Sequence, residues 1–288
     1  MTSLQNLNGT RQNMAEDESL QEVPKIIHYC WFGGGELSKS AKKTLASWER
    51  FAPGFEIRRC DETTFDVTSC DWTRKAYDAK KYAFVADYAR FKMIYDYGGV
   101  YMDLGSKLIR DITSLVEDYS PLSAIEELSR MVAPGLILVA RPHDPVVASV
   151  LSRYEVMSFI DDPEYLIRNT VNDVFVAELE KLGYSHKDEW QTVGDWTLLP
   201  SSAFNPVYGI GGYHIKRDTY SIHQSSGSWT EPELRVKQKI VRLLAPFLGR
   251  RIAQIIGRTI GEIKVKGIRN GAISLFNVTR DVMTREQR

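Results

Sequence analysis

Two acidic residues and one arginine have types and spacing suited to binding a ligand. Asp87 and Arg90 lie three residues apart in a stretch with helical periodicity, so they lie close together on one side of a helix. Asp103 lies at the end of the strand expected next, and open α/β sheets bind ligands at the carboxyl ends of their strands. Taken singly, each has an ordinary structural alternative. Asp87 and Arg90 could form a surface ion pair, and Asp103 could cap a turn.

The elements that must position these residues are a helix, a glycine pair and a short strand within residues 79–110. An apolar stripe at four-, three- and four-residue spacing indicates the helix: Phe84, Tyr88, Phe91 and Tyr95. Gly98-Gly99 can end this helix in a left-handed conformation, which residues with a Cβ resist. In the strand, Asp103 alternates with apolar residues and should point away from them: Val100, Met102 and Leu104.

The run FVADYARFKMIYDYGGVYMDLGS, residues 84–106, resembles the core of the glycosyltransferases with a DXD sugar-binding region. This is glycosyltransferase family thirty-two, which includes bacterial capsule and lipopolysaccharide sugar transferases and the yeast Och-type mannosyltransferases. Its pattern is close to F-V-S-D-Y-A-R and then G-G-I-Y-L-D-T-D. The second Asp of DXD is Gly105 here, and the matched positions are Phe84, Val85, Asp87, Tyr88, Ala89, Arg90, Gly98, Gly99, Tyr101 and Asp103.

The resemblance implies a GT-A-like α/β fold with a mostly parallel central sheet that binds a nucleotide sugar. Asp87 and Arg90 would hold sugar hydroxyls and a diphosphate oxygen, and Asp103 would contact the ribose and any divalent ion. These three are the expected catalytic residues. The family retains anomeric configuration; with no assured carboxylate nucleophile, we expect front-face transfer in which the leaving phosphate helps to deprotonate the acceptor. Further donor contacts are expected from Tyr82, Gly99 and Tyr101.

The first strand carries a second matched motif. The family opens with P-K-I-I-H-x-x-W-x-G, and this chain has PKIIHYCWFG from Pro24 onward. The β-branched and aromatic run, stopped by glycines at 33–35, predicts a buried strand followed by a permissive loop. The resemblance places His28 in the donor site and Trp31 against the base, where a rigid ring can stack. Asp61, after the second strand, is expected either to contact ribose or base or to cap a turn.

The last matched motif is YSIHQSSGSW, residues 220–229. It resembles the I-H-x-x-x-x-S-W segment that closes the catalytic domain of this family and folds over the donor diphosphate. The resemblance implies that His223 meets a phosphate or a metal, that Ser228 offers a hydroxyl to the donor, and that Trp229 excludes water.

The glycine at position 105 changes the expected dependence on a divalent metal ion. DXD enzymes hold manganese or magnesium partly through the second Asp, which is missing here. Asp103, the diphosphate and His223 could still hold an ion weakly, since magnesium often uses only one or two carboxylates plus phosphates. If the strand continues past Gly105, Lys107 has the parity of Asp103 and would reach the phosphates, with Arg110 assisting. We therefore expect weakened or absent metal dependence.

The composition fits one α/β domain with extensions. A chain of 288 residues can bury one good core, and equal numbers of basic and acidic residues, 37 each, indicate no class of partner. Three cysteines without ligand spacing predict neither a disulfide framework nor a zinc site, and fit a reducing cytoplasm. The start of the chain has no apolar run typical of a signal peptide, and no stretch is long and apolar enough for a membrane span.

We divide the chain into three parts: a polar, disordered tail at 1–22, a glycosyltransferase domain at 23–230, and a basic amphipathic helical region at 231–288. Within the domain, strands are expected near 24–33, 55–60, 121–127 and 133–141, and helices over 38–51, 144–157 and 164–182. Residues 231–270 contain ten basic and three acidic residues among aliphatic ones, which favours an anionic membrane surface. The alternative is a helical hairpin docked on the core; no nucleic-acid module is evident.

The predicted function is transfer of a hexose or N-acetylhexosamine from a nucleotide sugar, with UDP-sugars favoured, to a saccharide acceptor. By the resemblance, that acceptor would be lipid-linked and would belong to bacterial surface polysaccharide synthesis at the inner face of the membrane. The alternative is a non-catalytic nucleotide-sugar-binding or membrane-associated scaffold, which the missing second Asp of DXD suggests.

Overall fold

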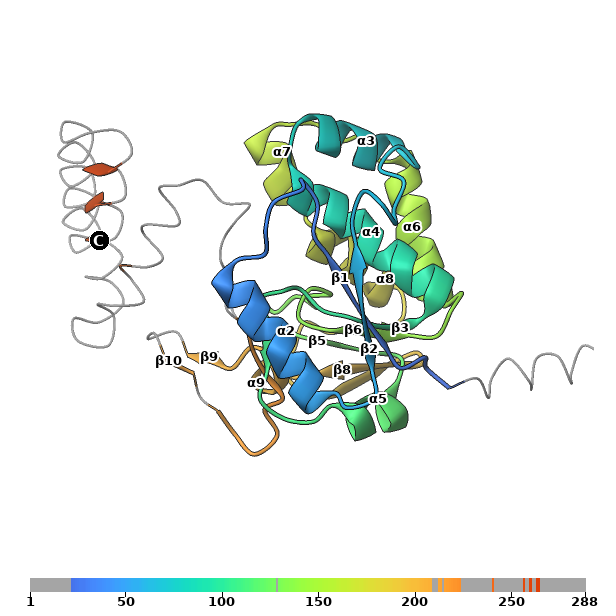
Figure 1. The fold of residues 1–288 in the computed structure, drawn as a ribbon. Helices are drawn as coiled ribbons and strands as arrows, with labels where there is room; N and C mark the ends of the chain where they lie inside the picture. Colours follow the sequence, from blue (N-terminus) through green and yellow to red (C-terminus); the bar gives the residue numbers. More distant parts are fainter. Residues whose placement is uncertain are drawn as a thin grey trace, which may run out of the picture.

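The fold is built on a seven-stranded mixed sheet in the order β2-β1-β3-β6-β5-β8-β7, seen in a computed structural model (Figure 1). The structure describes residues 22–127, 129–208, 212–213, 215–223, 240, 256, 259–260 and 263–264. The sheet strands are β1 (Ile26–Cys30), β2 (Glu56–Cys60), β3 (Gly99–Tyr101), β5 (Leu122–Ala124), β6 (Leu138–Ala140), β7 (Gln191–Val193) and β8 (Trp196–Leu199). Strands β2, β1, β3, β5 and β8 run in one direction and β6 and β7 in the other, so the expected mostly parallel α/β sheet is confirmed.

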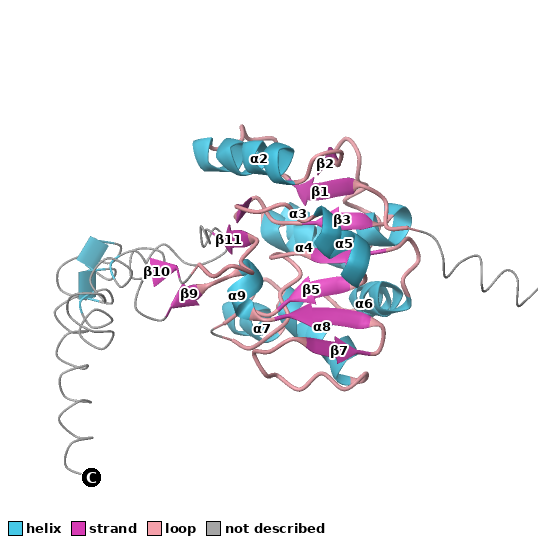
Figure 2. Cartoon of the chain, turned by 90° about the horizontal axis from the view of Figure 1, so that it is seen from below, coloured by secondary structure: helices cyan, strands magenta, loops and turns pink. Residues whose placement is uncertain are grey.

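Helices cover both faces of this sheet (Figures 1 and 2). On one face lie α3 (Asp71–Asp78), α4 (Tyr82–Tyr97), α6 (Pro145–Val156), α7 (Pro163–Arg168) and α8 (Val171–Glu180). On the other lie α2 (Lys39–Phe51), α5 (Thr113–Tyr119) and α9 (Ser201–Phe204). Two further ladders complete the described chain: β4 (Ser106–Leu108) with β11 (Ser221–His223), and β9 (Val207–Tyr208) with β10 (Gly212–Tyr213).

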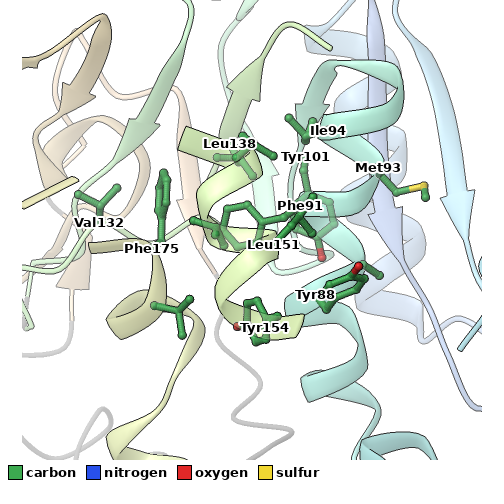
Figure 3. Packing of buried hydrophobic residues seen from close by; sticks show 14 of the residues in the cluster. Tyr88, Phe91, Met93, Ile94, Tyr101, Val132, Leu138, Leu151, Tyr154 and Phe175 are labelled. Carbon is green, nitrogen blue, oxygen red and sulfur yellow. The ribbon is translucent and has the colours of Figure 1, made fainter. Parts of the chain in front are cut away.

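Alternation along β3 divides its side chains between two apolar clusters. Val100 packs with the α2 and α5 side, whereas Tyr101 packs with α4, α6 and α8. Figure 3 shows the latter cluster, in which Phe91 of α4, Leu151 of α6 and Phe175 of α8 meet near Tyr101. The predicted alternation is therefore confirmed, and it directs Tyr101 toward α4.

Helix α4 is buried on nearly every side, although its sequence predicts a single apolar stripe. Asp87 and Arg90 are among its buried residues, at 8% and 5% exposure, so the surface-pair alternative is excluded. The helix ends at Gly98 with φ +62°, and Gly99 follows with φ +100°, as expected for the glycine pair. A Cβ on Gly99 would lie 2.6 Å from the carbonyl oxygen of Ile26, so this glycine lets β3 approach β1 closely.

The structure differs from the expected elements at two places. The strand expected to end on Asp103 ends at Tyr101, and a turn closed by the Ser106 amide donating to the Asp103 carbonyl (2.8 Å) leads into β4, which pairs with β11. The condition set for Lys107, a strand that continues past Gly105, is therefore not met. The single helix expected over 164–182 is two helices, because the hydroxyl of Thr170 caps α8 in a capping box with Asp173.

The predictions for the two ends of the chain fall mostly outside the described residues. This applies to the tail at 1–22 that was predicted to be disordered, of which only residue 22 is described. It applies also to the basic region at 231–288, of which residues 240, 256, 259–260 and 263–264 are described as helical. Among the described helices, none combines the length and apolarity that a membrane crossing requires.

Candidate functional site

A buried guanidinium group joins the two carboxylates that the sequence singles out. Nη2 of Arg90 donates to Oδ1 of Asp87 at 2.7 Å, and Nη1 of Arg90 lies 3.6 Å from Oδ1 of Asp103. Nε of Arg90 donates to the carbonyl oxygen of Ala86 at 3.1 Å. The side chains of Arg90 and Asp87 are 6% and 12% exposed, whereas that of Asp103 is 37% exposed. Asp103 is thus the member of this charge cluster that faces solvent most.

Tyr101 holds Asp103 from the neighbouring strand position. Its hydroxyl donates to Oδ1 of Asp103 at 2.8 Å, and its ring lies under the Arg90 guanidinium, with 4.9 Å between Cζ and the ring centroid. Because Tyr101 is 1% exposed, it is a fixed support. Tyr101 thus contacts Asp103, and the donor contact expected of Tyr101 stays a prediction.

Burial decides the pKa of Asp87, whereas neighbouring charges decide that of Arg90. Desolvation raises the pKa of Asp87 from 3.8 to about 7, against the opposing charge of Arg90 and with a smaller contribution from the charge of Asp103. For Arg90, burial lowers the pKa, but the charges of Asp103, Tyr101 and Asp87 together raise it above its ordinary value. Arg90 therefore stays positively charged, and Asp87 titrates near neutral pH.

The turn that carries Asp103 is fixed to the loop before β6. The backbone amide of Asp103 donates to the carbonyl oxygen of Gly135 at 2.9 Å, and the hydroxyl of Ser106 donates to the same oxygen at 3.1 Å. Sequence reasoning missed Ser106 and Gly135 as parts of this site. The isolated glycine in APGLILVAR was the available signal, since a glycine beside an apolar run often marks a close approach.

The glycine loop after β1 is tied to the helices on the same side as α4. The backbone amide of Gly33 donates to Oε1 of Glu62 at 2.6 Å, and the hydroxyl of Tyr77 donates to the same oxygen at 3.1 Å. Gly33 has φ +90°, and a Cβ there would lie 2.7 Å from Cδ2 of Tyr82. Tyr82 therefore supports the loop, and Glu62 is an anchor that the sequence analysis did not identify.

Two residues predicted from the first strand differ in their surroundings. Trp31 is half-buried at the start of the glycine loop, and its Nε1 donates to the carbonyl oxygen of Gly35 at 2.6 Å. His28 is 1% exposed, and its Nε2 lies 2.9 Å from the carbonyl oxygen of Gly98. Desolvation lowers the pKa of His28 to about 4, so the ring is neutral. The structure gives His28 a backbone partner in the core, while base stacking by Trp31 stays a prediction.

Asp61 caps its own turn. Its Oδ1 accepts hydrogen bonds from the backbone amide and the hydroxyl of Thr63, at 2.9 and 2.6 Å, and its Oδ2 lies 2.7 Å from Nε of Arg59. The hydroxyl of Thr63 is the main cause that lowers the pKa of Asp61. Of the two alternatives for this residue, the structure supports the turn cap.

The parity argument for Lys107 is wrong, because the chain turns between Asp103 and Ser106. Alternate residues of a strand face opposite sides, and in β4 it is Ser106 that faces Gly135 beside Asp103. Lys107 therefore faces the other way. Arg110, its expected assistant, is exposed and donates through Nε to the carbonyl oxygen of Thr219 at 3.3 Å.

The end of β11 returns to this turn. His223 is the register partner of Ser106, so the motif expected to close the site begins next to the residues that hold Asp103. Ser228 and Trp229 lie outside the described residues. Across the described part of the chain, no group of three or more His, Cys, Asp or Glu side chains is arranged to hold a metal ion. The expected metal role of His223 stays a prediction.

Comparison with known proteins indicates the class of protein to which this site belongs. Residues 38–122 match the family described as "Glycosyltransferase sugar-binding region containing DXD motif", and the match includes Asp87, Arg90 and Asp103. No curated protein matches the chain. A solved structure titled "PaToxG Glycosyltransferase" is similar over 56% of this chain and 69% of that chain, at 15% identity and a TM-score of 0.44. The family match supports a glycosyltransferase, with a nucleotide-sugar donor and a saccharide acceptor.

The raised pKa of Asp87 predicts a pH-dependent stability. Between pH 3.8 and about 7 the folded protein keeps a proton on Asp87 that the unfolded chain has released. The free energy of unfolding should therefore fall as the pH rises through this range, by on the order of 4 kcal/mol at most. Asp87→Asn removes the charge, so the stability of the variant relative to wild type should increase from pH 4 to pH 8 in thermal unfolding.

Asp66→Asn is the matched control for this measurement. Asp66 is exposed, and the hydroxyl and amide of Thr68 lower its pKa. Its stability difference from wild type should not increase between pH 5 and pH 8. A difference for Asp87→Asn that is flat over the same range would show that Asp87 is ionised throughout.

Proposed function

We propose that this protein transfers a hexose or N-acetylhexosamine from a nucleotide sugar, a UDP-sugar above others, to a saccharide acceptor. The observation that supports this proposal is the buried contact of Arg90 with Asp87 and Asp103, inside the segment that matches the sugar-binding family. An isolated surface pair needs no ligand, whereas a buried charge cluster that opens to solvent at one carboxylate is suited to polar recognition. Placement in glycosyltransferase family thirty-two belongs to the same proposal.

Asp103 and Asp87 have distinct roles in this proposal. Asp103, the more exposed carboxylate, contacts the ribose, and Asp87 contacts a sugar hydroxyl. Arg90 holds both carboxylates; since its Nε, Nη1 and Nη2 already face Ala86, Asp103 and Asp87, we assign it to orienting them rather than to a diphosphate oxygen. Transfer proceeds with retention at the front face, where the leaving phosphate takes the acceptor proton.

The diphosphate needs positive charge that Arg90 does not supply. A divalent cation fits only in part: Asp103 offers one carboxylate, whose Oδ1 already accepts from Tyr101, and Gly105 offers no side chain. When bound, such a cation would neutralise the leaving diphosphate. Asp103 would hold it together with the phosphates of the donor, and we therefore propose weak metal dependence.

We further propose that the acceptor is lipid-linked and that the basic region at 231–288 brings the enzyme to the cytoplasmic face of a membrane, for bacterial surface polysaccharide synthesis. This rests on the sequence alone, which has ten basic residues against three acidic ones over 231–270.

An assay of sugar transfer tests the central proposal. A thermal-shift screen against UDP-, GDP- and dTDP-sugars identifies the donor, and sugar transfer or donor hydrolysis by purified protein is then measured. Asp87→Asn should lower turnover by orders of magnitude and leave the fold intact, because the exchange is nearly isosteric. Asp66→Asn should retain wild-type turnover. Wild-type turnover in Asp87→Asn would contradict the proposed role, and donor binding without hydrolysis or transfer would favour the non-catalytic alternative.

Metal dependence is tested by chelation. We expect EDTA to reduce turnover only in part. Gly105→Asp should tighten manganese binding about tenfold or more, since it restores a carboxylate, and Gly105 does not have the positive φ that would exclude one. Complete loss of activity in EDTA, reversed by micromolar manganese in the wild-type protein, would show that Gly105 costs no metal affinity.

Membrane binding is tested by flotation of the full chain with liposomes. Each basic residue near an anionic surface contributes about 1 kcal/mol, and salt screens this attraction. We expect binding to anionic vesicles at low salt, weaker binding at high salt, and little binding to neutral vesicles. Equal binding to neutral and anionic vesicles would rule out the electrostatic account.

A further inference from the structure

Gly135 lies where a side chain would collide with the charge cluster. A Cβ built on Gly135 would overlap Oδ2 of Asp103, and it would lie 2.9 Å from Cγ of Asp103 and 3.0 Å from Nη1 of Arg90. The carboxylate of Asp103 therefore occupies the space that any other residue at 135 would fill.

The backbone of Gly135 has little freedom to move away. Its carbonyl oxygen accepts hydrogen bonds from the Asp103 amide at 2.9 Å and from the Ser106 hydroxyl at 3.1 Å. Ser106 is fully buried, and Leu136 next in the chain is 3% exposed. The turn carrying Asp103 and the loop carrying Gly135 are thus held against each other by two hydrogen bonds to one carbonyl oxygen.

The two residues that contact the Asp103 carboxylate, Tyr101 and Arg90, are also held in place. Tyr101 is 1% and Arg90 5% exposed, so neither can follow a carboxylate that is pushed aside. The side chain of Asp103 is 37% exposed and can swing toward solvent. A Cβ at 135 would therefore separate Asp103 from the Tyr101 hydroxyl and from Arg90, rather than displace the whole cluster.

We propose that Gly135 is a positioning residue: its missing side chain seats the Asp103 carboxylate against Tyr101 and Arg90, in the orientation that receives the ribose of a nucleotide donor. This inference rests on the proposed function for the ligand, while the contact between residues 135 and 103 stands independently of it.

A double-mutant cycle tests the contact without any assay of activity. The variants are Gly135→Ala, Asp103→Ala and the combination, and the readout is the thermal unfolding midpoint. We expect Gly135→Ala to lower the midpoint by on the order of 5 °C in wild type, and by much less when Asp103→Ala has removed the carboxylate. Equal losses in both backgrounds would overturn the proposal. If Gly135→Ala alone does not fold, the combined variant should; its failure to fold would also overturn the proposal.

Donor kinetics test the positioning role. Gly135→Ala should raise the KM for the nucleotide sugar at least tenfold with a smaller change in kcat, and the combined variant should be no worse than Asp103→Ala alone. Gly54→Ala is the control: Gly54 has φ +83°, but its Cβ would meet no atom within 4 Å, so stability should fall without a change in KM. An unchanged KM in Gly135→Ala would contradict the role.

Failure of the proposed function and failure of the inference about Gly135 would give different results. If the wild-type protein transfers no sugar and binds no donor, the proposed function fails, and the unfolding cycle still decides whether Gly135 seats Asp103. If the wild type is active and the two substitutions have additive effects on the midpoint and multiplicative effects on KM, only the inference about Gly135 fails.

Discussion

The site depends on one buried interaction, the contact of the Arg90 guanidinium with two carboxylates. A buried guanidinium carries a large desolvation cost, which is offset only when its donors are matched by acceptors of good geometry. Here Asp87 and the carbonyl of Ala86 accept hydrogen bonds from Arg90, Asp103 adds an ion pair at 3.6 Å, and Tyr101 lies against the guanidinium face. Removing Arg90 would leave Asp87 buried without its cation, and changes of that kind typically cost roughly 3–5 kcal/mol.

This constraint explains much of the surrounding fold. Helix α4 must be buried on nearly all sides to place Asp87 and Arg90 inside, and Gly99 after it allows β3 to lie directly against β1. Tyr101 then faces α4, and the turn after β3 is held by Gly135. The same constraint limits function, because a guanidinium engaged by two carboxylates is not free to neutralise a diphosphate. The charge for the leaving group must come from a cation or from another part of the chain.

The structural features that depend on local sequence pattern or on the matched motifs could be predicted from the sequence. The alternation of Val100 with Tyr101, the helix ending at Gly98-Gly99 and the helix beginning after Ser38 are all present. A strand end near Asp103 was expected, but the turn after it and the strand β4 that follows could not be predicted from the pattern, because the alternation in VYMDLGSKL continues through both. What ends the strand is non-local: hydrogen bonds to Gly135 and pairing of β4 with β11. Gly135 and Glu62 were missed for the same reason, since their partners are distant in sequence.

A crystal structure of the full chain with an intact nucleotide sugar tests the central claim most directly. We predict that the ribose lies within hydrogen-bond distance of Asp103, that a sugar hydroxyl contacts Asp87, and that Arg90 keeps its contacts with both carboxylates. A donor bound elsewhere on the protein, with Asp87, Arg90 and Asp103 in contact only with one another, would contradict this account and assign the charge cluster a purely structural role.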